Sequence, residues 1–171
     1  MTIIYNISVM KNELLLDQLK TEKASKEDWD EILALLEETN LIDRISGNGT
    51  YESFYTVKIQ NKIICCFAVL YEGKIGILKS FGIKKEYQGK GIGKNVSNKL
   101  PELLRNLGLT KIYAASWEAP DFWGKVGFQE VNFNKSSDDY FLQYAAYVEK
   151  NYPQFASKRK YFVLKLTYKS V

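Results

Sequence analysis

Three glycines stand at alternate positions in the segment 88–93, Gln-Gly-Lys-Gly-Ile-Gly, directly before a stretch with helical periodicity. Each glycine costs a helix about 1 kcal/mol relative to alanine, so helix propensity does not explain them. They are expected where the backbone takes a positive φ or approaches a ligand closely. A helix start exposes free N–H groups and the positive end of the helix dipole. Four lysines add charge around it: Lys84, Lys85, Lys90 and Lys94. The segment therefore predicts a phosphate or pyrophosphate cradle; the alternative is a tight turn beside a solvated lysine face.

Two common nucleotide-binding loops do not fit this glycine segment. The Walker pattern, GxxxxGK followed by Ser or Thr, requires glycine at Gln88 and a hydroxyl residue at Asn95. The dinucleotide fingerprint GxGxxG requires glycine at Lys94, and it normally opens a βαβ unit instead of following a meander. The residues present therefore exclude both classes of nucleotide site.

The chain contains no histidine, which removes a large group of mechanisms. Ser-His-Asp triads, Cys-His dyads, HExxH zinc sites and imidazole bases are all excluded, and we expect no metal. The two cysteines, Cys65 and Cys66, are adjacent in an apolar run, where a disulfide between them would be strained. We interpret them as small buried hydrophobic residues; a reactive thiol is the alternative.

Length and composition favour one compact domain over residues 1–171. The chain is 46% hydrophobic and 26% charged, which is close to globular averages. Its net charge of +4 is too small to indicate a nucleic-acid partner, but it suits a small polyanionic ligand. The chain lacks the pattern of a signal peptide, and no apolar run could span a bilayer. We therefore expect a cytoplasmic protein without a membrane partner.

The N-terminal part contains weak strand patterns followed by a clear helix pattern. Residues 3–9 and 14–22 alternate weakly, and each range predicts a short strand. Ser25, with an acid three residues later, predicts a helix start, and Asn40 predicts its end. Apolar residues follow Ser25 at helical spacing: Trp29, Ile32, Leu33 and Leu36.

From Tyr51 the pattern of apolar residues changes to a period of two, which predicts strands. Three such runs, over 54–59, 63–70 and 74–83, are joined by short turns and are typical of an antiparallel meander. The glycine segment follows, and then a helix ends at Gly108. Pro101 inside that helix predicts a kink.

The C-terminal part alternates strands and helices. Because a helix crosses over before it, the run 111–115 predicts a strand parallel to the strand that ends at Ile83. The other predicted elements are a helix over 120–126, a strand over 128–134, a tyrosine-rich helix capped at 136–139 and a strand over 160–168. The predicted fold class is mixed α/β.

At Gln88, Gly91 and Gly93 the chain resembles the GNAT acetyltransferase superfamily. The acetyl-CoA motif of that family reads Arg or Gln, two residues, Gly, one residue, then Gly or Ala. A second segment, 119–128, is similar to the family's Ala-x-x-x-Tyr-x-x-x-Gly-Phe pattern. The two motifs are separated by a helix and a strand, which is the family's spacing.

This resemblance covers about residues 16–134 and implies a fold. We expect a mostly antiparallel, twisted sheet of about six or seven strands, splayed between the fourth and fifth strands and flanked by helices. Residues 1–15 would be an N-terminal extension of the domain. Residues 135–171 would add a C-terminal helix and the final strand.

The resemblance also implies a site for acetyl-CoA as co-substrate. Backbone N–H groups of the glycine segment would hold the pyrophosphate, from Gln88, Gly89, Lys90, Gly91, Ile92, Gly93 and Lys94. The backbone of Phe81 and Ile83 would bond the pantetheine like an added strand. A bulge near Gly82 would open a gap for the thioester, whose carbonyl an amide there could polarise. Ser116 stands where many relatives have an Asn that contacts CoA, and Trp123 belongs to the second motif.

The chain departs from the family at both usual acid–base positions. Many relatives use the Tyr of the second motif as an acid toward the CoA thiolate, but Trp123 stands here and its indole is not a usable acid. A Glu on the fourth strand often serves as base, but the matching residue is Lys79. The catalytic side chains are therefore unassigned. Glu118 and Glu86 are conceivable substitutes, or they are solvated surface acids.

The family implies an N-acetyltransferase acting on a primary amine of a small molecule or peptide, by direct transfer in a ternary complex. A CoA-binding regulatory or sensor module with little turnover is one alternative, and a scaffold whose loop holds nothing is another. The chain would act as a monomer or a homodimer.

The acceptor pocket in this family is formed by the first helical region and the last strands, here near 37–50 and the helix from Tyr140. The tyrosines of that helix are either core packing or a wall of the pocket. In the second case three nearby acids would favour a cationic amine: Asp138, Asp139 and Glu149.

Overall fold

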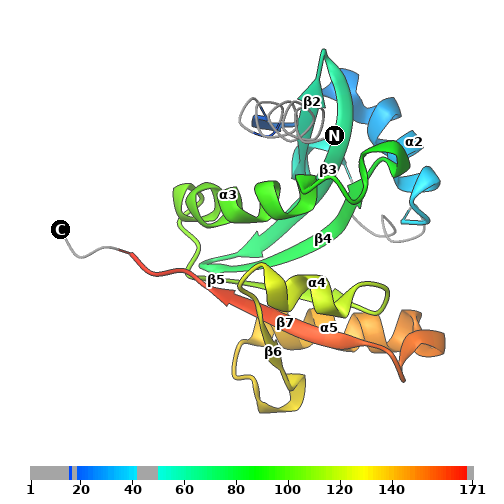
Figure 1. Cartoon of the computed structure of the whole chain (residues 1–171). Coiled ribbons are helices and arrows are strands. Elements are labelled where there is room, and N and C mark those ends of the chain that lie inside the picture. Colours follow the sequence, from blue (N-terminus) through cyan, green and yellow to red (C-terminus); the bar gives the residue numbers. More distant parts are fainter. Residues whose placement is uncertain (1–15, 17–18, 42–49, 169–171) are drawn as a thin grey trace, which may run out of the picture. The chain divides into compact units, whose positions relative to one another are not determined.

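The computed structural model describes Leu16 and residues 19–41 and 50–168 (Figure 1). The strands are β1 (Thr21–Lys23), β2 (Phe54–Ile59), β3 (Lys62–Glu72), β4 (Ile75–Ile83), β5 (Lys111–Ser116), β6 (Gln129–Val131) and β7 (Lys160–Lys165). The helices are α2 (Trp29–Glu38), α3 (Ile92–Asn106), α4 (Pro120–Lys125) and α5 (Asp139–Asn151). Single 3-10 turns are η1 (Lys26–Asp28), η3 (Tyr51–Ser53), η4 (Lys85–Tyr87), η5 (Phe133–Lys135) and η6 (Pro153–Phe155). Within these ranges, no helix combines the length and apolar character needed to cross a membrane.

The strands form one mixed sheet in the order β1-β2-β3-β4-β5-β7-β6. β4 and β5 are parallel, because α3 carries the chain back between them. β1 and β3 pair antiparallel with β2, and β5 and β6 pair antiparallel with β7. The predicted fold class is confirmed: a mixed sheet of seven strands with helices, and with its parallel pair at the fourth and fifth strands.

The three-stranded meander predicted from the period-two pattern is also confirmed. Gln60 and Asn61 form the turn between β2 and β3, and both have positive φ, 50° and 62°. Two consecutive positive φ angles match the twist of a tight hairpin, and asparagine tolerates them well. Gly73, with φ 55°, lies in the turn between β3 and β4.

The chain groups into two compact units, which are described one at a time. The first comprises residues 1–68 and 80–96, and the second comprises 69–79 and 97–171. β3 and β4 contribute residues to both, as does α3. The predicted single domain over 1–171 remains a prediction.

α2 supplies the core of the first unit. The predicted capping box lies at η1, the turn that leads into α2, and there the Ser25 backbone N–H donates to Asp28 Oδ2 over 2.9 Å. Asn40, with φ 57°, follows the end of α2. The buried face of the helix packs against strands β2 and β3, in a cluster that includes Ile32, Leu35, Leu36, Leu41, Phe54, Ile63 and Cys66.

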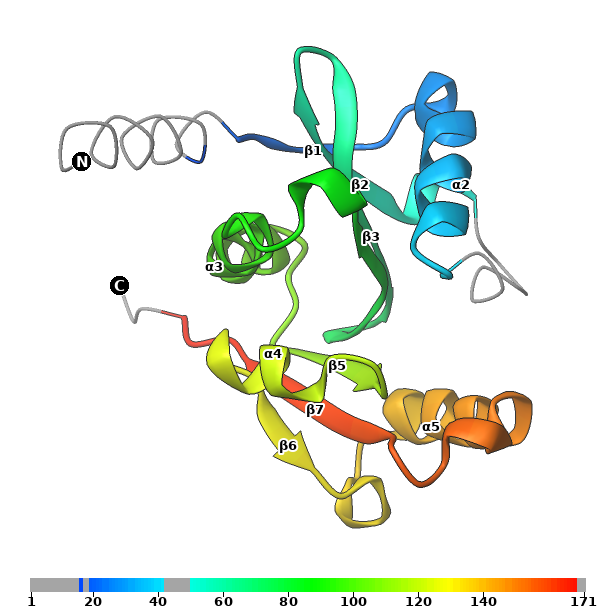
Figure 2. The ribbon, with the colours of Figure 1, turned by 45° about the vertical axis from the view of Figure 1, so that its right-hand side comes forward.

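α5 supplies the core of the second unit, where its buried residues pack with residues of β5 and β7. Figure 2 shows α5 next to the end of β5. Phe141, Ala145 and Val148 form its buried face. The Phe141 ring stacks on Tyr113 of β5 with centroids 3.9 Å apart, and its edge contact with Tyr161 of β7 is 5.7 Å. Offset-stacked and edge contacts of this kind add to the free energy gained by burial.

The predictions for the N-terminal residues have mixed outcomes. The strand predicted over 3–9 lies outside the described residues. The strand predicted over 14–22 is wrong at Leu16, which is helical, and agrees only at its end, where β1 begins at Thr21. Weak alternation could not distinguish the two states because it contained few β-branched or aromatic residues.

Candidate functional site

The end of β4 departs from regular strand geometry. Ser80 is buried and has a φ of 52°, which is unusual for a residue with a Cβ and occurs where a strand is bent or bulged. Gly82 follows two residues later and leaves no room for a side chain. A Cβ there would lie 2.8 Å from Leu35 Cδ2 and 3.1 Å from Thr39 Oγ1. The irregularity expected near Gly82 is therefore centred on Ser80.

The ladder between β4 and β5 is short. It runs from Ile75 opposite Lys111 to Leu78 opposite Ala114, whereas β4 continues to Ile83. β5 continues to Ser116 in register with β7, where Ser116 lies opposite Lys160. Within the described residues, the pairing of β4 with β5 therefore ends at the residue before Lys79.

The last residues of β4 offer a backbone edge. The Lys84 N–H donates to the Ile64 carbonyl of β3 over 2.9 Å. Because backbone groups alternate along a strand, those of Ile83 and Phe81 point to the opposite side. This is the orientation that an added strand requires. The Phe81 side chain is held by stacking on Phe67, with ring centroids 5.7 Å apart.

Two hydrogen bonds that involve side chains hold the loop from Lys84 to Gly91. The Lys85 N–H donates to Glu38 Oε1 over 2.7 Å, and Gln88 Nε2 donates to the Ile83 carbonyl over 2.9 Å. Gly89 and Gly91 have φ angles of 74° and 81°, in the region that side chains rarely adopt. The glycines are therefore required by the conformation of the loop, as their pattern predicted. A Cβ on Gly91 would lie 3.5 Å from Leu16 Cδ1.

Backbone donors gather where this loop enters α3. The first N–H of the helix to find a carbonyl is that of Asn95, which donates to Gly91 over 2.9 Å. In the part of the chain that the structure describes, the N–H groups from Gly89 to Lys94 donate to no backbone carbonyl. Such a row of donors at a helix start is suited to an anion.

The lysines around the loop are not equivalent. Lys84 forms an ion pair with Glu31 at 3.2 Å, so its charge is already balanced. Lys90 lies over the Tyr87 ring at 5.4 Å, while Lys85, Lys90 and Lys94 are exposed. The positive charge available at the loop is therefore smaller than the four lysines suggested.

The site residues predicted from the sequence fall into two groups. Ten of them lie together in the first unit: Phe81, Gly82, Ile83, Gln88, Gly89, Lys90, Gly91, Ile92, Gly93 and Lys94. Ser116 and Trp123 belong to the second unit. Ser116 is buried at the end of β5, and Trp123 is buried in α4 between the rings of Phe122 and Phe128, at 5.2 and 5.0 Å.

Lys79 is the charged residue of β4 nearest the irregular segment. It is half-buried, and among the described residues it forms no ion pair. Burial lowers the pKa of Lys79, and the nearby Tyr147 of α5 opposes that shift. Glu118 and Glu86, the conceivable substitutes for a base, are both exposed, as expected for surface acids.

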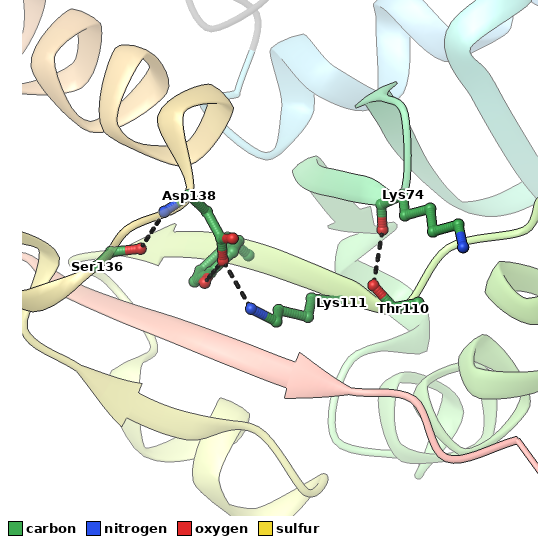
Figure 3. A network of polar contacts seen from close by, with 6 residues as sticks. Lys74, Thr110, Lys111, Ser136 and Asp138 are labelled. Carbon is green, nitrogen blue, oxygen red and sulfur yellow. Dashed lines mark hydrogen bonds and ion pairs between the residues drawn. The ribbon is translucent and has the colours of Figure 1, made fainter.

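Asp138, one of the acids expected near the acceptor, is engaged within the fold. Lys111 Nζ lies 3.0 Å from Asp138 Oδ2, and the Tyr113 hydroxyl donates to the same oxygen (Figure 3). Burial raises the pKa of Asp138, but the bonds from Tyr113 and Lys111 outweigh burial and lower it overall. Burial and the hydrogen bond to Asp138 raise the pKa of the Tyr113 hydroxyl to about 12.

Glu149 is likewise engaged, by an arginine that the sequence analysis missed. Arg159 Nη1 lies 2.6 Å from Glu149 Oε1, as an ion pair without hydrogen-bond alignment, and the Tyr161 hydroxyl donates to the same oxygen over 2.9 Å. The Arg159 side chain is 1% exposed and faces the Trp117 ring at 5.7 Å. No local pattern marks Arg159 as buried, because its partners are distant in sequence.

The two cysteines are fully buried. Burial raises the pKa of Cys65 well above that of a free thiol and raises the pKa of Cys66 to about 12. Only the thiolate is a good nucleophile, so neither side chain is set up for covalent catalysis.

Comparison with known proteins gives a partial match to one family model. Residues 50–130, a little under half of the chain, match the family model described as acetyltransferase (GNAT) domain. No protein of curated function matches the sequence.

Solved structures with the same fold include N-acetylglutamate synthase from Neisseria gonorrhoeae, complexed with coenzyme A and N-acetyl-glutamate. That enzyme is 16% identical, with a TM-score of 0.68 over 88% of this chain, and this chain spans 35% of its length. IAA acetyltransferase from Bacillus cereus is 18% identical, with a TM-score of 0.62 over 87% of this chain and all of the other. A GNAT-family acetyltransferase from Staphylococcus aureus is 14% identical, with a TM-score of 0.62 over 87% and 99% of the two chains.

Proposed function

We propose that the protein moves an acetyl group from acetyl-CoA to a primary amine, because residues 50–130 match the family model described as acetyltransferase (GNAT) domain. The acceptor is a small molecule or a peptide, and the transfer is direct, within a ternary complex. The amine nitrogen bonds to the thioester carbon, the carbon–sulfur bond breaks, and CoA leaves as a thiolate. The amine gives up a proton, so the products are an N-acetyl amide and free CoA.

The observation that carries this proposal is the row of backbone donors from Gly89 to Lys94 at the start of α3. Positive φ at Gly89 and Gly91 turns the loop without a Cβ on its surface at either position. The N–H groups and the helix dipole then favour a pyrophosphate there, with exposed Lys90 and Lys94 beside it.

The edge of β4 supports the other half of the cofactor site. Because backbone groups alternate along a strand, those of Phe81 and Ile83 are expected to point away from β3. A pantetheine amide could pair with them as an extra strand does, sharing the Ile83 carbonyl with Gln88 Nε2. Ser80 bends the chain just before this edge. Holding a thioester against a fixed edge supplies rate by positioning alone, which suits a site whose usual acid and base are absent.

Direct transfer is favoured over an acyl-enzyme by the state of the thiols. Cys65 and Cys66 have no exposure, and burial keeps both protonated at neutral pH. The chain also contains no histidine that could activate a hydroxyl to carry the acetyl group.

One specific observation favours a second function, a CoA-binding sensor with little turnover. Lys79 and Trp123 stand where an acid–base pair is usual, and Trp123 is packed between two rings. A protein that binds acetyl-CoA without a proton acceptor for the amine would report the cofactor instead of consuming it.

Two measurements test the proposal. Thermal unfolding with acetyl-CoA at about 100 times its Kd should show about 2.7 kcal/mol of added stability, and no shift would reject both CoA functions. Release of CoA thiol should then be followed with polyamines, amino acids, aminoglycosides and peptides. The buried cysteines give little background with a thiol reagent. Binding without thiol release on any acceptor would leave the sensor as the better account.

A further inference from the structure

Two carboxylates of α2 contact the chain where it leaves β4 for the loop from Lys84 to Gly91. The Lys85 backbone N–H donates to Glu38 Oε1 over 2.7 Å, and Lys84 Nζ donates to Glu31 Oε1 over 3.2 Å. Glu31 and Glu38 are seven residues apart, which is close to two helical turns, so they lie on one side of α2. All of these residues belong to the first unit. α2 therefore holds two consecutive residues at the entrance to the loop.

The helix that carries these carboxylates is packed against the end of β4. Gly82 admits two side chains of α2, because a Cβ there would lie 2.8 Å from Leu35 Cδ2 and 3.1 Å from Thr39 Oγ1. Leu35 is fully buried, and Thr39 Oγ1 donates to the Leu35 carbonyl over 2.8 Å. Glu38 lies between these two residues in the sequence. Its carboxylate is therefore attached to a closely packed part of the helix.

Glu38 supplies a cap that the sequence of the loop does not provide. The first N–H groups of a helical turn lack partners within it, and an acceptor side chain just before the turn usually satisfies one of them. The residue before η4 is Lys84, whose ammonium offers no acceptor. The Lys85 N–H bonds to Glu38 instead, and the N–H groups of Tyr87 and Gln88 then donate to Lys84 and Lys85 over 2.9 and 3.2 Å. The turn that leads to the row of donors therefore begins at the bond to Glu38.

The charge of Glu38 is unfavourable for α2 itself. Glu37 and Glu38 are the last two residues of the helix, where the helix dipole is negative and disfavours a carboxylate. Glu37 is exposed, whereas Glu38 is half-buried and accepts the bond from Lys85. The two neighbours have the same side chain and the same relation to the dipole, but they differ in their contact with the loop. They therefore form a matched pair for an experiment.

We propose that Glu38 is a positioning residue for the cofactor. Its carboxylate fixes the Lys85 backbone and so sets the direction in which the loop presents the donors from Gly89 to Lys94 to the CoA pyrophosphate. This inference rests on the acetyltransferase function proposed above. Glu38 acts through the loop and not on the reacting atoms. Without the bond, binding must also order the start of η4, and that cost weakens the affinity.

The experiment measures two Kd values by calorimetric titration, for acetyl-CoA and for adenosine 3′-phosphate 5′-diphosphate, which carries the pyrophosphate without pantetheine. Glu38→Ala should raise both Kd values by the same factor, about 3- to 10-fold, which corresponds to one hydrogen bond. Glu38→Gln keeps an acceptor oxygen at the same reach and should recover most of the affinity. Glu37→Ala removes the same charge from the same helical turn without removing the bond, so this control should keep the wild-type values.

Three results would overturn the inference: unchanged affinity in Glu38→Ala, an equal loss in Glu37→Ala, or a loss for acetyl-CoA that spares the diphosphate. If the wild-type protein binds neither compound, the proposed function fails, and hydrogen exchange of residues 84–94 without ligand tests the role of Glu38 separately. Faster exchange there in Glu38→Ala than in Glu37→Ala, as measured by mass spectrometry, would support Glu38 as the residue that holds the loop. Equal exchange in the two variants would refute it.

Discussion

Gly91 is the residue on which the cofactor site depends most directly. Its φ of 81° disfavours any side chain, and the residue lies within the row of backbone donors from Gly89 to Lys94. Gly91→Glu also adds a negative charge beside the proposed pyrophosphate. We expect acetyl-CoA binding to weaken by about 100-fold or more, roughly 2.7 kcal/mol, in calorimetric titration.

Gly73→Glu is the matched control for this variant. Gly73 also has a positive φ, 55°, and lies in an exposed turn with nothing within 4 Å of its Cβ position. The control should lose a comparable amount of stability but keep its affinity. Unchanged affinity in Gly91→Glu would show that the loop does not bind the cofactor.

Cys65 provides a second prediction at the residue scale. Because its thiol is buried and protonated, Cys65→Ser and Cys65→Ala should keep kcat within about twofold. Their cost should appear as lost stability of about 1 kcal/mol. The measurement is turnover together with intact mass after acetyl-CoA treatment. Loss of activity in a folded Cys65→Ala protein, or an acetyl adduct on the thiol, would restore the covalent mechanism.

At the scale of elements, Gly82 sets how closely β4 approaches α2. Its missing side chain admits Leu35, Thr39 and Leu41, and a Cβ would lie 2.8 to 3.3 Å from their atoms. Gly82→Ala should therefore destabilise the protein by about 1–3 kcal/mol through overpacking, measured by urea unfolding. Gly124→Ala, in α4 with open space around it, should be neutral or stabilising. Equal stability of the two variants would contradict this packing.

Asp138 joins the start of α5 to β5. The pKa of Asp138 is lower in the folded state than in the unfolded state, where it is near 3.8. The carboxylate therefore stabilises the fold fully above about pH 3.8, and this stabilisation is lost as the pH falls through the lower pKa of the folded state. Asp138→Asn should cost about 1.5–3 kcal/mol at pH 7, since it removes charged hydrogen bonds. The cost should shrink below pH 4, as followed by urea unfolding across pH. A cost independent of pH would mean that the carboxylate charge is unimportant.

At the scale of the whole molecule, polar anchors hold separate segments of the second unit together. Arg159 links the chain before β7 to Glu149 of α5 and to Trp117 after β5. Glu149→Gln leaves the buried guanidinium without its counter-charge. We expect about 2 kcal/mol of lost stability, less than for a fully buried pair because Glu149 is 38% exposed.

The exposed pair of Lys160 and Glu130 serves as the comparison. Its side chains are 46% and 56% exposed, so Glu130→Gln should cost much less stability than Glu149→Gln. Thermal unfolding of both variants side by side measures the difference. Similar midpoints for the two would indicate that water reaches Arg159 and weakens the buried pair.

Much of the architecture followed from local patterns. The capping box at Ser25, the period-two runs of β2 to β4 and the terminating Gly108, with φ 76°, are each specified by residues close in the chain. The positive φ at Gly89 and Gly91 was foreseeable for the same reason, because few residues besides glycine tolerate it. These features gave the fold class and the predicted cofactor loop.

The sequence by itself determined the glycine loop, the order of the elements from α2 to β7 and the absence of imidazole chemistry, because each depends on residue type and short spacing. Only the tertiary structure decided which charges remain available. Lys84 proved to be balanced by Glu31, Asp138 by Lys111 and Glu149 by Arg159, whereas Lys79 forms no ion pair among the described residues. An ion pair forms between side chains that folding brings within a few ångströms, and sequence distance does not encode that proximity.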